Sequence, residues 1–122
     1  MVAYFFDTYA IIELLDHNPE YAPYNHCGFV TTVLNKIELH SWAVSKYGED
    51  FGEIILASIP TQEVTDDIIR AATAFRHKHK HRNISYTDAI GYAFARAEGL
   101  TFLTGDKAFL DIPHVKHIPK RA

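Results

Sequence analysis

The sequence contains a single cysteine, Cys27, which excludes an intrachain disulfide and a cysteine-rich metal site. Stability must therefore come from packing, and a reducing compartment is permitted. The sequence also has no apolar run near the 18 or so residues that a membrane-spanning helix needs. Its apolar start is interrupted by Asp7 and Glu13 and lacks the basic segment of a secretion signal. We expect a cytoplasmic protein without a membrane anchor.

An excess of basic residues is missing as well. The 12 Lys and Arg residues are outnumbered by 15 Asp and Glu residues, and the formal net charge is −3. This argues against binding nucleic acid through a general positive field, for which a strongly basic domain is typical. The exception is HKHKHR at residues 77–82, which has three fixed cations and three histidines. It fits either a solvated helix end or a segment that contacts phosphates.

The sequence does have enough apolar residues for a core. It is 48% hydrophobic over 122 residues, and a chain of this size buries roughly 65% of its unfolded surface or more. We expect one domain over residues 1–122. Short runs of β-branched and aromatic residues predict strands at residues 2–6, 28–32, 61–64, 100–104 and 114–118.

Apolar residues at helical spacing lie between these runs. They predict helices at residues 8–17, 32–47, 49–59, 66–81 and 85–99, with single helical turns near residues 17–26 and 106–111. Strands that alternate with helices imply crossover connections and a parallel sheet. The predicted fold class is α/β, a three-layer α/β/α sandwich with a mainly parallel sheet of four to five strands.

Two aspartates follow expected strands directly: Asp7 comes after YFF and Asp106 after TFLTG. Ligands of parallel sheets collect outside the carboxyl ends of the strands, so both side chains would meet at one rim if these strands are neighbours. Glu38 lies inside one expected helix and Asp88 begins another. Each acid has an ordinary alternative: a helix cap for Asp7 and Asp106, a favourable first-turn charge for Asp88, and a solvated helix face for Glu38.

Taken together, these acids and their contexts resemble a PIN domain, and specifically the small VapC-like toxins of prokaryotic toxin–antitoxin pairs. The stretches that carry the resemblance are FFDTYAIIELL, LNKIELH, YTDAIGYAFARAEGLTFLTGD and DKAFLDIPHVKHI. They cover nearly the whole chain. The resemblance implies a shared cavity of Asp7, Glu38, Asp88 and Asp106, and RNA cleavage that depends on Mg²⁺ or Mn²⁺. As partners it implies a second copy of the chain and an antitoxin protein.

The physics of a carboxylate cluster agrees with a metal site. Two unit charges about 4 Å apart repel by about 4 kcal/mol at an effective dielectric of 20, a large part of a total stability of about 5 to 15 kcal/mol. Divalent cations offset this repulsion, and oxygen ligands suit Mg²⁺ or Mn²⁺ rather than zinc. Two ions would activate a water and stabilise the leaving oxygen; with one ion, a carboxylate would act as general base.

Other residues extend the expected site. Asp111 is a further metal-ligand candidate, and its alternative is a turn residue before Ile112 and Pro113. Thr8 and Thr104 are candidates for hydrogen bonds to the ligating carboxylates. The candidates for contact with RNA phosphates are Lys36, Arg96 and Lys107.

A function of another class also fits, a noncatalytic PIN-like module that binds a protein and uses the acids as caps. The acidic identity of all four positions argues against it. A receiver-type phosphoacceptor domain would need an acidic pair after the first strand, where this sequence has Asp7 and Thr8. The favoured hypothesis is a metal-dependent endoribonuclease. Stabilisation by Mn²⁺ would separate it from a binding module.

Overall fold

The computed structural model of the chain describes residues 3–24 and 30–120. Val2, Asn25, His26, Cys27, Gly28 and Phe29, which the sequence-based predictions include, lie outside the described residues. The elements are β1 (Tyr4–Phe6), α1 (Thr8–Leu15), the 3₁₀ helix η1 (Pro19–Tyr24), α2 (Val33–Tyr47), α3 (Glu49–Ser58), α4 (Asp66–Lys78), the 3₁₀ helix η2 (Lys80–Arg82), α5 (Tyr86–Ala97), β2 (Thr101–Thr104), the 3₁₀ helix η3 (Lys107–Phe109) and β3 (Val115–His117).

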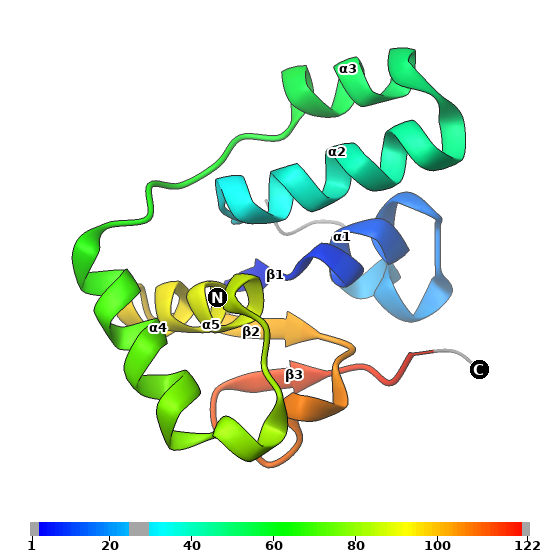
Figure 1. Cartoon of the computed structure of the whole chain (residues 1–122). Helices are drawn as coiled ribbons and strands as arrows, with labels where there is room; N and C mark the ends of the chain where they lie inside the picture. The colour runs from blue at the N-terminus through cyan, green and yellow to red at the C-terminus, as the bar shows by residue number, and fades with distance from the viewer. Residues whose placement is uncertain (1–2, 25–29, 121–122) are drawn as a thin grey trace.

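The three strands form a parallel sheet in the order β1-β2-β3, which Figure 1 shows edge to edge. Phe5 pairs with Phe102, and Thr104 pairs with His117. Since β1 and β2 are neighbours, the residues that follow them, Asp7 and Asp106, leave the sheet at the same edge. The prediction that Asp7 and Asp106 meet at one rim requires neighbouring strands, and β1 and β2 are neighbours.

Among the described residues the sheet is smaller than the sequence predicts, and the second and third expected segments contribute isolated parallel bridges. Val30 bridges to Phe5 beside β1, and Thr32 bridges to Gln62. The Phe6 amide donates to the Val30 carbonyl at 3.1 Å, and the Gln62 amide donates to the Thr31 carbonyl at 2.8 Å. These contacts extend the parallel order by two short segments without making regular strands. The prediction of a fold with a parallel sheet between helices is confirmed, and the described residues form three strands instead of four or five.

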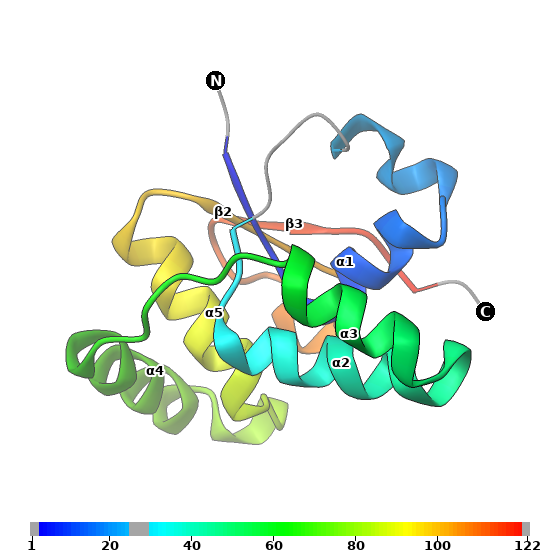
Figure 2. The same cartoon turned by 90° about the horizontal axis from the view of Figure 1, so that it is seen from above.

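The two faces of the sheet are covered by separate hydrophobic cores, which gives the three predicted layers. Successive strand residues point to opposite faces: Phe5 and Phe102 face one core, and Phe6 and Leu103 face the other. The first core is completed by α4 and α5, which pack together, and the second by α1 and the helical hairpin of α2 and α3, as Figures 1 and 2 show.

Helix α5 lies close to the sheet because of a glycine at its centre. A Cβ atom at Gly91 would lie 2.7 Å from Cε1 of Phe5 and 3.1 Å from Cε1 of Phe102. No larger residue fits without moving the aromatic rings. The small residues of the Ala-rich segment therefore bring the start of α5, with Asp88, to the carboxyl end of the sheet.

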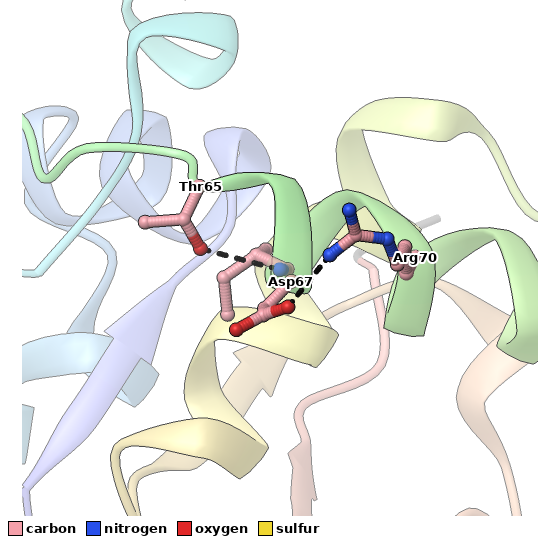
Figure 3. A network of polar contacts seen from close by, with 4 residues as sticks. Thr65, Asp67 and Arg70 are labelled. Carbon is pink, nitrogen blue, oxygen red and sulfur yellow. Dashed lines mark hydrogen bonds and ion pairs between the residues drawn. The ribbon is translucent and has the colours of Figure 1, made fainter.

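Helix α4 also begins with acidic residues, and here they stabilise the start of the helix. Thr65 is its N-cap and accepts a hydrogen bond from the Ile68 amide at 3.3 Å, and Asp67 pairs with Arg70 at 2.7 Å (Figure 3). Asp66 and Asp67 are solvent-exposed in the first turn. The cap and the acidic first turn of this helix therefore have structural roles.

The HKHKHR segment ends α4 and forms η2. Its last residue has a structural role, because the Arg82 guanidinium donates to the carbonyl of Ala108 at 3.1 Å and to that of Leu110 at 2.7 Å. These bonds connect η2, which follows α4, to the η3 segment. His77, Lys78 and Lys80 are exposed. Over the described ranges, no helix is both long enough and apolar enough to cross a membrane.

Candidate functional site

The four acids singled out by the sequence line one pocket at the carboxyl edge of the sheet. Its volume is about 230 Å³, and its lining residues are Asp7, Thr8, Tyr9, Ile12, Glu38, Ser85, Asp88, Asp106 and Lys120. The acids come from the end of β1, from α2, from the start of α5 and from the end of β2. Residues that are up to a hundred positions apart in sequence thus meet in a single hollow.

Asp7 is the most deeply buried of the four, with 3% of its surface exposed. It is the N-cap of α1, and its Oδ1 accepts a hydrogen bond from the Ala10 amide at 2.7 Å. Burial raises its pKa to about 6, against the opposing effects of the Thr104 hydroxyl, the Ala10 amide and the Lys120 ammonium. The helix-cap alternative is thus correct for Asp7, and the cap fixes the carboxylate in the wall of the pocket.

Asp106 is held in a similar way just after β2. Its Oδ1 accepts from the Ala108 amide at 2.9 Å, which caps η3, and its own amide donates to the Thr104 hydroxyl at 3.1 Å. Thr104 is fully buried and also hydrogen-bonds Asp7. Thr104 therefore bonds the side chain of Asp7 and the backbone amide of Asp106.

Asp88 lies in the first turn of α5, whose N-cap is Ser85. Burial raises the pKa of Asp88 to about 7, and the negative charges of Asp7, Asp106 and Glu38 act in the same direction. A hydrogen bond between the Asp88 and Asp106 side chains adds to the increase. Two carboxyl groups share a hydrogen bond when one of them is protonated. Burial and the neighbouring carboxylates therefore leave Asp88 partly protonated at neutral pH in the metal-free protein.

Glu38 is exposed at the rim of the pocket and is oriented by a relay of polar side chains. The Asn35 amide donates to the Thr8 hydroxyl at 3.1 Å, and Thr8 donates to Oε1 of Glu38. The Oδ1 atom of Asn35 accepts from the Thr32 hydroxyl at 2.8 Å in the capping box that begins α2. Thr8 therefore contacts a pocket carboxylate, as its place in the sequence predicts.

The donor chemistry of the pocket suits a hard divalent cation. Its acids offer only oxygen ligands, the set that Mg²⁺ and Mn²⁺ prefer. Burial, with a contribution from neighbouring carboxylates, raises the pKa values of Asp7 and Asp88, and a bound cation would favour their ionised forms. Within the part of the chain that the structure describes, no three such side chains are already close enough to enclose an ion. Mg²⁺ does not require such a cage, because it keeps several waters and uses one or two carboxylates.

Four further sequence candidates lie outside the residues that line this pocket. Asp111 is exposed, with a left-handed backbone (φ 66°), which agrees with its alternative as a turn residue. Arg96 is exposed in the last turn of α5, the end of the helix opposite to Asp88. Lys36 is half-buried in α2. Lys107 lines a neighbouring hollow that shares Asp106 with the acidic pocket.

Sequence reasoning missed four residues at the site. Ser85 and Asn35 carry a local signal, since each lies in a capping pattern of two polar residues three positions apart. Tyr9 and Lys120 carry none: the Lys120 ammonium lies 4.9 Å from the centre of the Tyr9 ring because the chain after β3 returns to the pocket. Only the tertiary course of the chain places this lysine beside the acids.

Comparisons with known proteins agree with this architecture. The family model described as PIN domain matches residues 4–115. Among solved structures, a toxin–antitoxin complex from Klebsiella pneumoniae matches with a TM-score of 0.72 and 23% identity, over 95% of this chain and 99% of the other. Comparison with curated protein sequences gives no match.

Two further structures have the same fold. VapC20 from Mycobacterium tuberculosis, described as a Sarcin-Ricin loop cleaving toxin, matches with a TM-score of 0.67 and 18% identity, over 81% of this chain and 85% of the other. VapBC2 from Rickettsia felis, bound to a DNA fragment from its promoter, matches with a TM-score of 0.71 and 14% identity, over 95% and 98%. At these identities the likeness establishes the fold.

Proposed function

We propose that this chain, which belongs to the PIN domain family, is a divalent-metal-dependent endoribonuclease of the VapC toxin type. The observation that carries the proposal is the convergence of Asp7, Glu38, Asp88 and Asp106 on one pocket at the carboxyl edge of the sheet. Capping bonds or a hydroxyl hold three of these carboxylates in place. A site that only stabilised the fold would not gather four acids in one hollow, because their repulsion lowers stability.

The residues divide into two groups by burial. Asp7, Asp88 and Asp106 form the inner part of the pocket, and we assign them as ligands of one or two Mg²⁺ or Mn²⁺ ions. Such ions supply an electrophile for the phosphate and lower the pKa of a bound water. Asp88 carries a proton in much of the metal-free protein and must release it when a cation binds, which makes metal affinity increase with pH. Glu38, at the exposed rim and oriented by Thr8, can accept a proton from the attacking water.

The proposed substrate is RNA, and the proposed partners are a second copy of the chain and an antitoxin that neutralises it in the cytoplasm. One structure with this fold is a toxin–antitoxin complex, another is VapBC2 on promoter DNA, and a third is a toxin that cleaves the Sarcin-Ricin loop. Size-exclusion chromatography with light scattering tests the dimer. Co-expression with the product of the adjacent gene, followed by purification and an RNA-cleavage assay, tests the antitoxin.

Cleavage of structured RNA by purified protein tests the enzyme assignment, with Mg²⁺ or Mn²⁺ and with chelator. We expect cleavage only with the metal. Asp7→Asn and Asp106→Asn should lower it by at least about 100-fold, since even residues that only support metal ligands contribute 10- to 100-fold. Asn keeps a capping oxygen, so both variants should fold, which circular dichroism verifies.

The matched control is Asp111→Asn, the same chemical change at an exposed position outside the pocket. It should cleave like the wild type. Equal cleavage by the wild type and both pocket variants would exclude the assignment. A protein that binds RNA or a protein partner but never cleaves RNA would favour the noncatalytic module instead.

A further inference from the structure

A second hollow adjoins the acidic pocket and has the opposite charge. Its volume is about 200 Å³, and it shares Asp106 and Lys120 with the acidic pocket. The rest of its lining is Gly105, Lys107, His117 and Pro119. We call it the basic hollow, because two fixed cations and an imidazole lie around a single carboxylate. Acidic pocket and basic hollow are thus contiguous along the edge of the sheet.

The strand register explains why His117 and not Lys116 reaches this place. His117 pairs with Thr104, the residue whose hydroxyl bonds Asp7, and Lys116 pairs with Leu103, which points into the opposite core. Successive strand residues face opposite sides of a sheet. His117 therefore lies on the side of Thr104 and the hollow, and Lys116 lies on the other side. This difference supplies a control residue.

The position of Lys120 depends on a glycine of the TGD sequence. A Cβ atom at Gly105 would lie 2.9 Å from two carbon atoms of the Tyr9 ring, so only glycine lets the ring come this close. The Lys120 ammonium in turn lies over that ring, 4.9 Å from its centre. A cation over an aromatic face is attracted by the ring quadrupole. The ring thus holds a positive charge at the junction of the two pockets.

The lysines of the hollow are not neutralised by direct ion pairs with described residues. Across residues 3–24 and 30–120, neither Lys107 nor Lys120 forms an ion pair with a carboxylate. In the same part of the chain, Nε2 of His117 is buried without a hydrogen-bond partner. An unpaired buried polar atom is unfavourable unless something pairs with it. The two exposed lysines of the lining are therefore the groups that an anion with several acceptor oxygens can reach.

We propose that the basic hollow binds the phosphate of an RNA strand that neighbours the phosphate at the acidic pocket. The inference rests on the proposed function, since it names a contact for that substrate. An anionic polymer can cross both pockets because it meets cations in each. The acidic pocket needs bound divalent ions to accept a phosphate, and the basic hollow supplies its own positive charges. Lys107 and Lys120 are then positioning residues that fix the register of the strand.

Binding of a short fluorescein-labelled single-stranded RNA, measured by anisotropy in chelator at several salt concentrations, tests the hollow without cleavage. Lys107→Gln and Lys120→Gln should each weaken binding. Each should also reduce the slope of log K against log salt by about 0.7, the value for one phosphate contact on a single strand. Lys116→Gln should bind like the wild type. All three lysines are exposed, so the variants should fold, and thermal melts verify this.

A set of the same RNA with one uncharged methylphosphonate linkage at each position in turn locates the contact. One position should weaken wild-type binding several-fold and have no further effect in Lys120→Gln. Three outcomes would overturn the proposal: effects of the methylphosphonate and of Lys120→Gln that add at every position, a loss of RNA affinity in Lys116→Gln equal to that of the other two variants, or no RNA binding by the wild type. Cleavage with Mn²⁺ is assayed separately. If the protein cleaves RNA but the effects of the methylphosphonate and of Lys120→Gln on binding add at every position, only the proposal for the basic hollow is rejected. If these effects do not add at one position but no condition gives cleavage, only the nuclease assignment is rejected.

Discussion

Replacing Asp88 with Asn should make the metal-free protein more stable. Burial and the charges of Asp7, Asp106 and Glu38 all raise the pKa of Asp88, to about 7. An elevated pKa of an acid means that the folded state disfavours the ionised form relative to the unfolded chain. Asn keeps the size and hydrogen-bonding ability of the side chain and carries no charge. The substitution therefore removes a cost of folding at neutral pH.

The size of the effect follows from the two pKa values. A rise from 3.8 to about 7 corresponds to an upper limit of about 4 kcal/mol, since one pKa unit is about 1.36 kcal/mol. Asp88 keeps some contact with solvent, and water and local relaxation reduce such costs. We expect a gain of about 2 kcal/mol in the free energy of unfolding. For a chain of this size that raises Tm by roughly 5 to 10 °C.

The sign of the pH dependence gives a second measurement on the same variant. The folded protein binds more protons than the unfolded chain between the ordinary pKa of Asp, 3.8, and the raised values of about 6 for Asp7 and about 7 for Asp88. These two groups therefore lower stability as pH rises from about 4 to about 7. This slope should be steep in the wild type and shallower in Asp88→Asn.

Urea unfolding in chelator at pH 5.0 and 7.5, followed by circular dichroism, measures both effects. The control is Asp111→Asn, which changes an exposed acid outside the pocket and keeps a residue type that tolerates a left-handed backbone. Its stability should match that of the wild type at both pH values. If Asp88→Asn is less stable than the wild type at pH 7.5, the carboxylate is a net stabilising first-turn charge and the electrostatic reasoning is wrong.

Three further predictions concern the metal, the relay and the core. Mn²⁺ at 100 times its Kd should stabilise the wild type by about 2.7 kcal/mol in scanning fluorimetry and Asp106→Asn far less. Asn35→Ala, which breaks the relay through Thr8, should lower cleavage by about 10- to 100-fold in initial-rate assays, with binding of the labelled RNA unchanged. Gly91→Ala, whose Cβ would lie 2.7 Å from Phe5, should cost about 1 to 3 kcal/mol in urea unfolding.

The order and type of the elements could be predicted from the sequence because hydrophobic periodicity is local. The failures are at the sheet edge. The segment at Thr32 does not continue as a strand because its amide bonds the Asn35 side chain at 3.3 Å in a capping box, and α2 begins at the next residue. The segment at Gln62 is exposed and bridges to Thr32, which lies outside the three-stranded sheet. A capping bond ends the first segment, and the second is paired with that segment and not with β1, β2 or β3.

The site was predictable where it depends on strand ends. Asp7 and Asp106 follow neighbouring parallel strands, and topology alone brings them to one edge. Arg96, a predicted RNA contact, lies outside the residues that line the pocket: it is eight residues after Asp88, and at 1.5 Å per residue that is about 12 Å along the helix. Lys120 was not predictable, since its place depends on the path of the chain after β3 and on the Tyr9 ring.

Opposite signs of the stability change should distinguish a functional acid from a structural cap in this chain. Thr65 caps α4 far from the acidic pocket, and Thr65→Ala should lower the free energy of unfolding by about 1 kcal/mol with unchanged RNA cleavage. Asp88→Asn should do the reverse, raising stability and abolishing cleavage. Natural sequences keep a destabilising residue where function needs it. If both substitutions lower stability and neither affects cleavage, Asp88 is a helix-start residue like the acids of α4, and the pocket has no catalytic role.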